Sequence, residues 1–370
     1  MRPEQKQKKY TKSHRLTKLS AATLVAALAA GLAPELGYPT NDTTAAARQP
    51  AKELVVKPNS RKSPEKLIDR RIGIGVHFNC VPMNLEERQL VYRSLEDNHI
   101  GWARINLNWN DLEPNTKGSW DTKILDSLDD CIIRAKDNNV RPLIVFQGSP
   151  GWANGGKDWT NPPNDSADYA NALSFLAKRY KGIVKGWEIW NEPNLDDKFW
   201  RGSPQQMVEL MKAAYPAVKE ADPKAYVLMP GIVLNKPNYL TYLKELYEAG
   251  ASNYFDILSI HGYLPSRQIN DGLQAMIKTS EASGDTKKPV WLTEFAVPVS
   301  GYTTEEDQAK YAAEVLKLIS ANLRVKAAFW FQAKDAGSGD GWEKGVAAIN
   351  SDGRPRPVLA ALGKAASGTK

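Results

Sequence analysis

The sequence predicts an α/β fold of the (β/α)8 TIM-barrel type, formed by a single domain over residues 69–368. From about residue 70 onward, short apolar runs alternate with longer stretches of helical periodicity. Eight such units follow one another, and the 370-residue chain has room for one barrel of roughly 250–300 residues. Repeated strand-then-helix units build parallel sheets, and eight equal units suit closure into a barrel.

The expected strands are short apolar runs, each followed by a longer polar or amphipathic segment. They are expected at residues 71–78, 102–109, 141–147, 184–191, 225–231, 255–263, 289–296 and 325–333.

The amphipathic segments between these runs are expected to form helices. Several begin with Ser, Asp or Thr, residue types that cap helix N-termini. Pro223 follows one of them and is expected to stop that helix before the next strand. An open, doubly wound sheet is the alternative fold, but no G-x-G-x-x-G motif follows the first strand.

The positive charge of the chain is concentrated near its beginning. The net charge is +7, yet residues 1–66 hold 13 Lys and Arg against 5 Asp and Glu, which leaves the rest at −1. The expected domain is therefore nearly neutral, and no basic face for nucleic acid is predicted.

Residues 1–34 are expected to be a signal peptide or an N-terminal anchor. A basic stretch precedes the uncharged run "LSAATLVAALAAGLAP", which contains an A-x-A-like site at Ala27–Ala29. Residues 35–68 are rich in Thr, Ala, Lys and Pro and are expected to be a flexible linker. The domain is therefore expected to be secreted or periplasmic, with retention by an uncleaved N-terminus as the alternative, and the folded part is expected to bind no membrane.

The cysteines and histidines predict neither a disulfide nor a metal site. Cys80 and Cys131 are the two cysteines of the chain, and they are expected to be buried free thiols. His77, His99 and His261 are scattered without metal-ligand spacing, so no metal or other cofactor is expected.

Two glutamates are expected at strand ends, where the active sites of such barrels lie. Glu192 ends the fourth expected strand in "WEIWNEPN", and Glu294 ends the seventh in "WLTEFA". Burying a carboxylate is costly unless it is paired or used. Glycoside hydrolysis requires two carboxyl groups that lie close to each other, and these strand ends could provide them.

These motifs resemble those of clan A glycoside hydrolases. "WEIWNEPN" resembles the acid/base motif of the clan, and "WLTEFA" resembles its nucleophile motif. "WARINLNWNDLEPNTKGSWD", "SPGWA" and "HGY" make the chain most similar to family 39, which includes β-xylosidase-like enzymes and bacterial exopolysaccharide endoglycosidases. The resemblance implies a retaining β-glycosidase with Glu192 as acid/base and Glu294 as nucleophile.

The expected roles impose opposite requirements on the two carboxyl groups. Glu294 must stay ionised, so Arg104 and Tyr263 are expected to donate hydrogen bonds to it. Glu192 must start protonated, so an apolar wall and the charge of Glu294 are expected to raise its pKa. Asn191 is expected to bond the 2-hydroxyl of the reacting sugar.

Further site residues are expected from the remaining strand ends. His261 shares a strand face with Tyr263 and is expected to shape the floor of the site, with a core histidine as the alternative. Trp330 is expected to form an apolar platform under the reacting sugar. Other tryptophans in expected loops could line a groove or simply pack in the core: Trp109, Trp152, Trp159, Trp200 and Trp342.

Glu188 is expected to be structural. It lies four residues before Glu192, roughly 13 Å back along the strand at about 3.3 Å per residue. A buried ion pair with Arg104 is expected instead.

The leading hypothesis is a hydrolase that acts on a polysaccharide or oligosaccharide, with long loops favouring endo action. A catalytically silent polysaccharide-binding barrel is the first alternative. An inverting hydrolase, with carboxyl groups about 6.5 Å or more apart, is the second. The sugar, the linkage and the oligomeric state are not predicted.

Overall fold

In the computed structural model, the described residues are 73–78, 80–195, 198–335 and 341–368. All of them belong to one unit, Leu36–Lys370. The expected signal and linker, residues 1–68, lie outside the described residues, so both stay predictions. No helix in the described part of the chain has the length and apolar character needed to cross a membrane.

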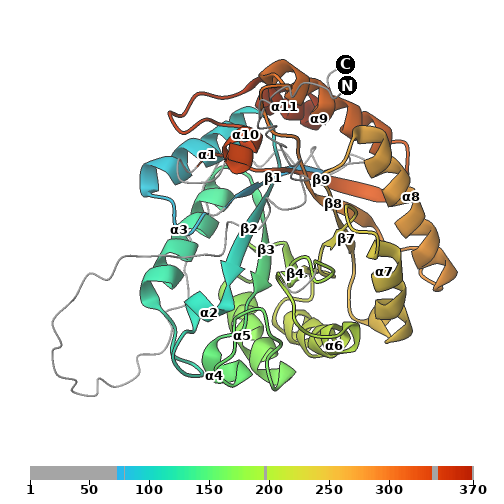
Figure 1. Cartoon of the computed structure of the whole chain (residues 1–370). Helices are drawn as coiled ribbons and strands as arrows, with labels where there is room; N and C mark the ends of the chain where they lie inside the picture. Colours follow the sequence, from blue (N-terminus) through green and yellow to red (C-terminus); the bar gives the residue numbers. More distant parts are fainter. Residues whose placement is uncertain (1–72, 79, 196–197, 336–340, 369–370) are drawn as a thin grey trace, which may run out of the picture. The chain divides into compact units, whose positions relative to one another are not determined.

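The strands and helices alternate as the sequence predicts (Figure 1). The strands are β1 (Gly73–Phe78), β2 (Trp102–Asn108), β3 (Arg141–Gln147), β4 (Gly186–Ile189), β5 (Tyr226–Leu228), β6 (Ile232–Val233), β7 (Leu258–Gly262), β8 (Val290–Phe295) and β9 (Val325–Phe331). The helices are α1 (Leu85–Asp97), α2 (Trp109–Leu112), α3 (Thr122–Asp137), α4 (Gly151–Asn154), α5 (Ser166–Arg179), α6 (Pro204–Ala221), α7 (Tyr239–Glu248), α8 (Ser266–Ala282), α9 (Glu305–Ile319), α10 (Gly341–Val346) and α11 (Pro357–Ser367), with a 3₁₀ turn at Ala251–Asn253.

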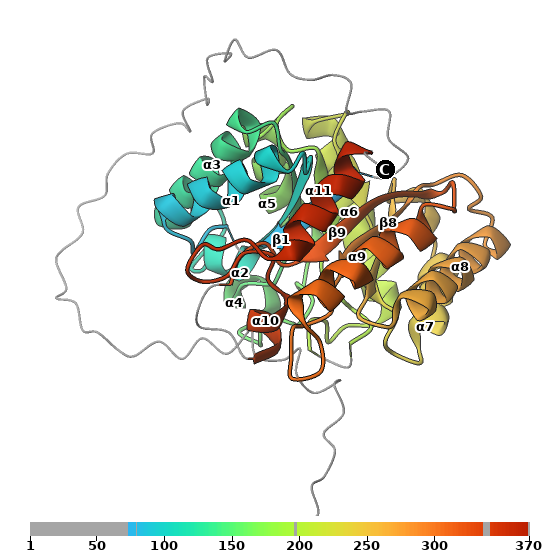
Figure 2. The same cartoon turned by 90° about the horizontal axis from the view of Figure 1, so that it is seen from above.

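The helices begin where their capping residues predict. Asn84 and Glu87 form a reciprocal capping box at α1, and Ser203 with Gln206 does the same at α6. These side chains satisfy backbone N–H groups that have no partner within the helix. In both views α9 and α11 lie side by side against the sheet (Figures 1 and 2).

All strand pairs of the sheet are parallel, in the order β5-β4-β3-β2-β1-β9-β8-β7-β6. The expected fifth strand, residues 225–231, contains β5, and β6 begins directly after it; β5 and β6 lie at the two ends of this order. Isolated parallel bridges join Leu228 to Ile257 and Asn191 to Gly231. Because all strands run the same way, their carboxyl ends meet at one edge.

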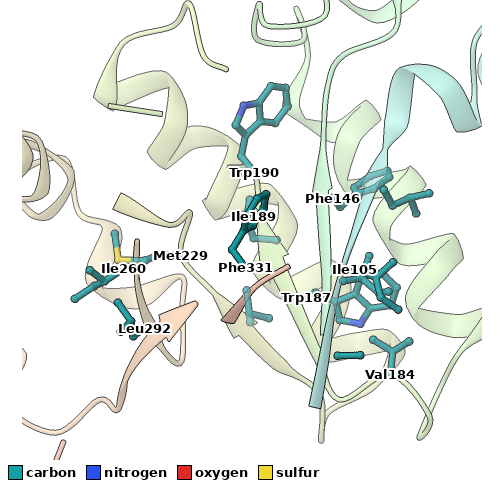
Figure 3. Packing of buried hydrophobic residues seen from close by; sticks show 14 of the residues in the cluster. Ile105, Phe146, Val184, Trp187, Ile189, Trp190, Met229, Ile260, Leu292 and Phe331 are labelled. Atoms are coloured by element: carbon teal, nitrogen blue, oxygen red, sulfur yellow. The ribbon is translucent and has the colours of Figure 1, made fainter. Parts of the chain in front are cut away.

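The two faces of the sheet bury different residues. We call the face that carries Arg104, Glu188, Ser259 and His261 the site face, and the opposite one the helix face. On the site face an apolar cluster underlies these polar groups: Trp102, Leu143, Leu228, Ile257, Trp291, Ala327 and Phe329. On the helix face a larger cluster joins strands to helices, including Ile105, Phe146 and Trp187 (Figure 3).

The prediction of two free thiols is wrong. Cys80, just after β1, forms a disulfide with Cys131 in α3, with 6.1 Å between their Cα atoms. Both residues are fully buried. The spacing of the two cysteines carries no sign of this bridge, because the approach of α3 to the segment after β1 depends on how the helices pack over the sheet.

Candidate active site

Four strands, or the segments that follow them directly, place charged side chains at one point. Nδ1 of His261, from β7, lies 2.7 Å from Oε1 of Glu192 and 3.5 Å from Oε2 of Glu294. Arg104, from β2, donates through Nη1 to Oε1 of Glu294. One ligand atom each from Glu192, His261 and Glu294 lie within 4.8 Å of one another. The two glutamates singled out in the sequence therefore share one site.

Arg104 connects three partners through its three nitrogens. Nε donates to Oε2 of Glu188 at 2.7 Å, Nη1 donates to Glu294, and Nη2 donates to Oδ1 of Asn191 at 3.0 Å. Arg104 and Glu188 are fully buried, so the expected structural ion pair is present. Because a guanidinium only donates, the Asn191 oxygen faces it and the Asn191 amide nitrogen faces away.

The backbone at the end of β4 turns Asn191 and Glu192 toward the site face. Trp190 has φ 69° and Glu192 has φ 44°, left-handed conformations that non-glycine residues rarely adopt. Each costs on the order of 1–3 kcal/mol and is characteristic of functional sites. The turn sends Trp190 to the helix face, where its Nε1 donates to the Phe199 carbonyl.

A loop contact fixes the segment that follows Glu192. The side chain of Asn194 donates to the Val233 carbonyl and accepts from the Val233 amide, both at 3.0 Å. Asn194 is almost fully buried. This pair of hydrogen bonds ties the loop after β4 to β6, so the strained backbone at Glu192 is supported on both sides.

An irregularity in β8 turns both Thr293 and Glu294 toward the site face. The pairing register shifts between Leu292 and Phe295, and also beside His261 in β7. Thr293 lies 2.5 Å from Ser259, whose Oγ donates to Glu188 at 2.8 Å, while Glu294 receives the Arg104 and Tyr263 hydrogen bonds. Strict alternation would have placed one of the two on the helix face.

The environment of His261 favours its charged form. Burial opposes the charge, but the negative charge of Glu294 and hydrogen bonds to Glu188 and Glu192 outweigh it and raise the His261 pKa to about 9. Nε2 lies 3.3 Å from Nη2 of Arg104 and 3.8 Å from Oε1 of Glu188. A charged imidazole ring cannot accept a hydrogen bond from Arg104. The Nε2–H of His261 is therefore directed to Glu188.

The pKa values of Glu188 and Glu192 are shifted in opposite directions. Burial raises the pKa of Glu192, the charge of Glu294 adds to this, and His261 and Arg104 oppose it. The pKa of Glu188 is lowered, since the attraction of Arg104 and His261 exceeds the cost of burial. These two pKa shifts are thus opposite, although both carboxyl groups lie near His261.

Tyr263 supplies the second hydrogen bond to Glu294. Its hydroxyl donates to Oε2 of Glu294, so both donors expected from the sequence contact this carboxylate. Burial and the nearby charges of Glu294 and Glu192 raise the pKa of Tyr263 well above its usual value. The phenol therefore keeps its proton and remains a donor.

Trp330 does not form the expected sugar platform. It is fully buried on the helix face, its Nε1 donates to the Val346 carbonyl, and its ring packs edge-on against Phe295 and Tyr311. The physical reason is alternation along β9, which turns Phe329 and Phe331 to the site face and Trp330 away from it.

The tryptophans after β2, β3 and β4 hold their loops in place. Trp109 is fully buried, and its Nε1 donates to Glu113 at 2.6 Å. Trp152 is half-buried, packs against Trp109 and donates to the Glu113 carbonyl at 2.8 Å. Trp200 is buried against Trp190. These rings anchor loops, because each indole N–H is used by the loop it holds.

Trp342, in α10, is the tryptophan that adjoins the site. Its ring centroid lies 5.3 Å from that of Tyr263 and 5.7 Å from that of Phe331. Trp342 is half-buried, in contrast to Trp330. The loop after β9, rather than the strand itself, thus brings a large apolar ring beside the hydroxyl that binds Glu294.

Sequence reasoning missed several residues of the site. Ser259 could have been found, because it precedes His261 by two positions on the same strand face. Thr293 and Trp342 could not, because one depends on the β8 irregularity and the other on the fold of a loop.

Within the described residues, Glu192, His261 and Glu294 are the group with spacing suited to a metal ion. A metal ligand histidine must offer an unprotonated nitrogen, whereas the pKa of His261 is raised to about 9. Arg104 also directs a positive charge at Glu294. These donors fit a hydrogen-bonded acid pair better than they fit a cation.

Comparison with known proteins points to glycoside hydrolases. A family model described as the glycosyl hydrolase catalytic core matches residues 167–361, which include both glutamates. A β-xylosidase from Caldicellulosiruptor saccharolyticus is 29% identical over 158 residues, 39% of this chain and 31% of that protein. Endo-1,4-β-xylanase A from Phanerodontia chrysosporium is 24% identical over 267 residues, 68% of this chain and 63% of that protein. The chain therefore spans less than two thirds of either relative.

Solved structures with the same fold include a family 39 glycoside hydrolase from Bacteroides cellulosilyticus WH2, with a TM-score of 0.65 and 23% identity over 80% of this chain and 63% of that one. A monomeric β-xylosidase from Caulobacter crescentus CB15 has a TM-score of 0.63 and 16% identity, over 80% of this chain and 68% of that one. At these identities the likeness concerns the fold.

Proposed function

Since this chain belongs to the glycosyl hydrolase catalytic core family, we propose that it is a retaining glycosidase that cleaves β-glycosidic bonds in a polysaccharide or oligosaccharide. Glu192 is the acid/base and Glu294 is the nucleophile. The observation that carries this proposal is the approach of the two carboxyl groups. An oxygen of Glu192 lies within 4.8 Å of an oxygen of Glu294.

That separation favours retention over inversion. Retaining enzymes hold their carboxyl groups about 5–5.5 Å apart, whereas inverting enzymes leave about 6.5–9.5 Å for a water molecule. The distance between the two carboxylate oxygens lies on the retaining side of these ranges. The inverting alternative therefore has less support than the retaining one.

In the first step, a Glu294 oxygen attacks the anomeric carbon while the bond to the leaving oxygen breaks. Glu192 gives its proton to that oxygen. Arg104 and Tyr263 keep Glu294 ionised before attack and orient its two oxygens. The imidazolium of His261 stabilises Glu192 as it becomes negative, because Nδ1 remains 2.7 Å away.

In the second step, Glu192 removes a proton from water, which attacks the anomeric carbon and breaks the bond to Glu294. The ester on Glu294 carries no charge, so the repulsion that raised the pKa of Glu192 is absent. Glu192 then acts as a base, and both carboxyl groups return to their starting states.

Asn191 would bond the 2-hydroxyl of the reacting sugar through its amide nitrogen, since its oxygen is occupied by Arg104. Such a hydrogen bond strengthens in the transition state. Trp342 takes the platform role that Trp330 does not fill, because its ring lies beside Tyr263.

The sheet closes into a (β/α)8 barrel in this proposal. The bridges Leu228–Ile257 and Asn191–Gly231 support closure, since they link β5 toward β7 and β4 toward β6. Together, β5 and β6 then fill the remaining place in the ring. In a barrel of this kind the site lies at the carboxyl ends of the strands, as Glu192, His261 and Glu294 do here.

A neutral β-linked polymer is the substrate class that we propose, with endo action favoured by the long loops after β3 and β4. The relatives include a β-xylosidase and endo-1,4-β-xylanases, so β-xylosides are the first substrates to test. The Cys80–Cys131 disulfide supports export to an oxidising compartment, periplasmic or extracellular.

The test is incubation of the full chain with xylan, other neutral β-glucans and mannans, bacterial exopolysaccharides, and aryl β-glycosides. Products are read by mass spectrometry, and Glu294→Gln is the matched control. Oligosaccharides released by the parent alone support an endo-glycosidase, and single sugars indicate exo action. Binding of one polymer without cleavage would favour the silent barrel.

A further inference from the structure

We infer that the amide oxygens of Asn106 and Gln147 bind a neutral sugar unit of the substrate through its hydroxyl donors and select against a uronate there. The inference rests on the proposed glycosidase function and deepens it by naming a specificity-determining pair. We call Asn106, Asn108 and Gln147 the amide shelf.

The amide shelf adjoins the catalytic residues on the site face. Trp102, Arg104, Asn106 and Asn108 alternate along β2, so they share one face. Asn106 lies about 7 Å beyond Arg104 in the direction of the carboxyl end, at about 3.4 Å per residue. Gln147 ends β3 directly opposite Asn108. The shelf is therefore the next polar layer beyond Arg104, which holds Glu294 and Asn191.

The direction of the hydrogen bonds in the amide shelf is fixed by Asp111. Its Oδ2 accepts a hydrogen bond from Nδ2 of Asn108 at 2.8 Å, and an ionised carboxylate can only accept hydrogen bonds. The oxygen of Asn108 must then face Gln147, whose Nε2 donates to it at 3.2 Å. Gln147 is left with its oxygen directed away from this chain of hydrogen bonds.

Asp111 holds a second amide in the same way. Its Oδ1 accepts a hydrogen bond from Nδ2 of Asn110 at 2.8 Å. The oxygen of Asn110 lies against Gly148, which has φ +82° and no room for a Cβ atom on that side. Asn110 thus locks Asp111 in place, while its own oxygen is turned to the backbone rather than to the site face.

Two acceptors of the amide shelf are buried without a partner in the described part of the chain. They are Oδ1 of Asn106 and Oε1 of Gln147, and the Gln147 residue is only 5% exposed. Buried polar atoms nearly always have a hydrogen-bond partner in native proteins. Oδ1 of Asn110 and Oγ of Ser149 nearby are also buried without one, but of these oxygens the two in the shelf lie on the site face beside the proposed catalytic centre and need a functional explanation. Both are carbonyl oxygens, which require donors.

A neutral sugar supplies those donors, because its hydroxyl groups can each give a proton to an amide oxygen. A uronate carboxylate has none to give, and it would lie close to two carbonyl oxygens and the negative Asp111. Like-charge contacts and unpaired buried acceptors are strong sources of discrimination between ligands. The shelf therefore distinguishes sugars by whether their ring substituents are hydroxyl groups or a carboxylate. This selection does not depend on bond cleavage at Glu192.

The test measures binding by isothermal titration to the full-length Glu294→Gln variant. The probes are xylotriose, cellotriose and the matched β-1,4-linked triglucuronate, which has carboxylates in place of the cellotriose hydroxymethyl groups. We expect at least one neutral trisaccharide to bind at least about tenfold more tightly than triglucuronate. Adding Gln147→Met or Asn106→Leu should weaken that neutral binding by about threefold to tenfold, the effect of one lost hydrogen bond. The control Gln205→Met, an exposed glutamine on α6, should change it less than twofold.

A second variant covers the case in which the apolar substitutions disturb folding. Asn106→Asp keeps the shape and the acceptors but adds a charge, so it should widen the preference for the neutral trisaccharide by about fivefold. Unchanged affinity in all three shelf variants, tighter binding of triglucuronate, or no binding of either neutral trisaccharide would overturn the inference. Hydrolysis by the parent decides the proposed function separately, because it does not depend on any shelf variant.

Discussion

Nδ1 of His261 lies 2.7 Å from Oε1 of Glu192, while the opposite side of the same ring faces Glu188. The histidine therefore joins the acid at the strand end to the structural ion pair beneath it. Because Glu188 is held by Arg104, which also holds Glu294, Glu192 and Glu294 are connected through His261, Glu188 and Arg104. The proposed catalytic pair is thus part of a single hydrogen-bonded unit.

The stability of the protein should fall as the pH rises from about 6.5 to about 9. The His261 pKa is raised from 6.5 to about 9, so its stabilisation is fully present below about 6.5 and is lost as the pH passes through 9. The change should be roughly 3 kcal/mol in the free energy of unfolding, measured by urea denaturation at a series of pH values.

The variant His261→Asn is the control for this pH dependence. It removes one of the four imidazole rings of the chain and leaves the other three in place. The variant should be less stable at pH 6 and should lack most of the slope. An unchanged slope in the variant would contradict a charged His261.

Azide should rescue the two catalytic variants with opposite stereochemistry. Glu192→Ala and Glu294→Ala should each lower kcat/KM on aryl β-glycosides by at least about 10²-fold, with smaller losses for Glu192→Ala when the leaving group is a good one. Azide should then give a β-glycosyl azide with Glu192→Ala, because the glycosyl-Glu294 intermediate still forms. It should give an α-glycosyl azide with Glu294→Ala, since azide attacks in place of the nucleophile.

The same configuration of azide product from both variants would reject these roles. NMR spectroscopy of the isolated azides makes the measurement. Glu188→Gln is the comparison variant, because it removes a buried charge at Arg104 without removing a proposed reacting group. It should lose stability and should give no glycosyl azide.

The two tryptophans at the end of β9 and in α10 should behave differently. Trp342→Ala should lower kcat/KM by about tenfold, since it removes the ring beside Tyr263. Trp330→Phe should retain kcat/KM. Its free energy of unfolding should fall by about 1 kcal/mol, because the hydrogen bond to the Val346 carbonyl is lost. Steady-state kinetics and thermal denaturation measure both. Loss of activity in Trp330→Phe at unchanged stability would restore Trp330 as the platform.

The disulfide should stabilise the fold under oxidising conditions. It closes a loop with a sequence separation of 51 residues, and such a crosslink typically contributes about 2–4 kcal/mol by restricting the unfolded chain. Reduction of the parent, or the double substitution Cys80→Ala with Cys131→Ala, should therefore lower the midpoint of urea denaturation. Reductant should leave the double variant unaffected. A parent that is insensitive to reductant under denaturing conditions would contradict the bridge.

Periodicity was sufficient to predict the parallel α/β arrangement, because buried parallel strands and amphipathic helices differ clearly in the spacing of apolar residues. It also placed Glu192 and Glu294 at strand ends. The strand β6 was not predicted, since it is only two residues long and follows Pro230 and Gly231, which mark the end of the expected fifth strand.

The errors in the site arise where a strand departs from regular geometry or where a loop folds over it. Trp330 was assigned by its motif, although alternation with Phe329 and Phe331 places it on the helix face. The irregularity at Thr293–Glu294 and the left-handed backbone at Glu192 have no signal in residue spacing. The Cys80–Cys131 bridge likewise depends on tertiary packing that local patterns do not encode.

The most direct test of the paired-glutamate account is the anomeric configuration of the first product. The full-length enzyme would be mixed with the best β-linked substrate of the panel, and the anomeric proton of the new reducing end followed by NMR spectroscopy before mutarotation. The account predicts that the β-anomer appears first, because two displacements at Glu294 restore the configuration. Initial formation of the α-anomer would contradict the account, since it requires direct attack by water.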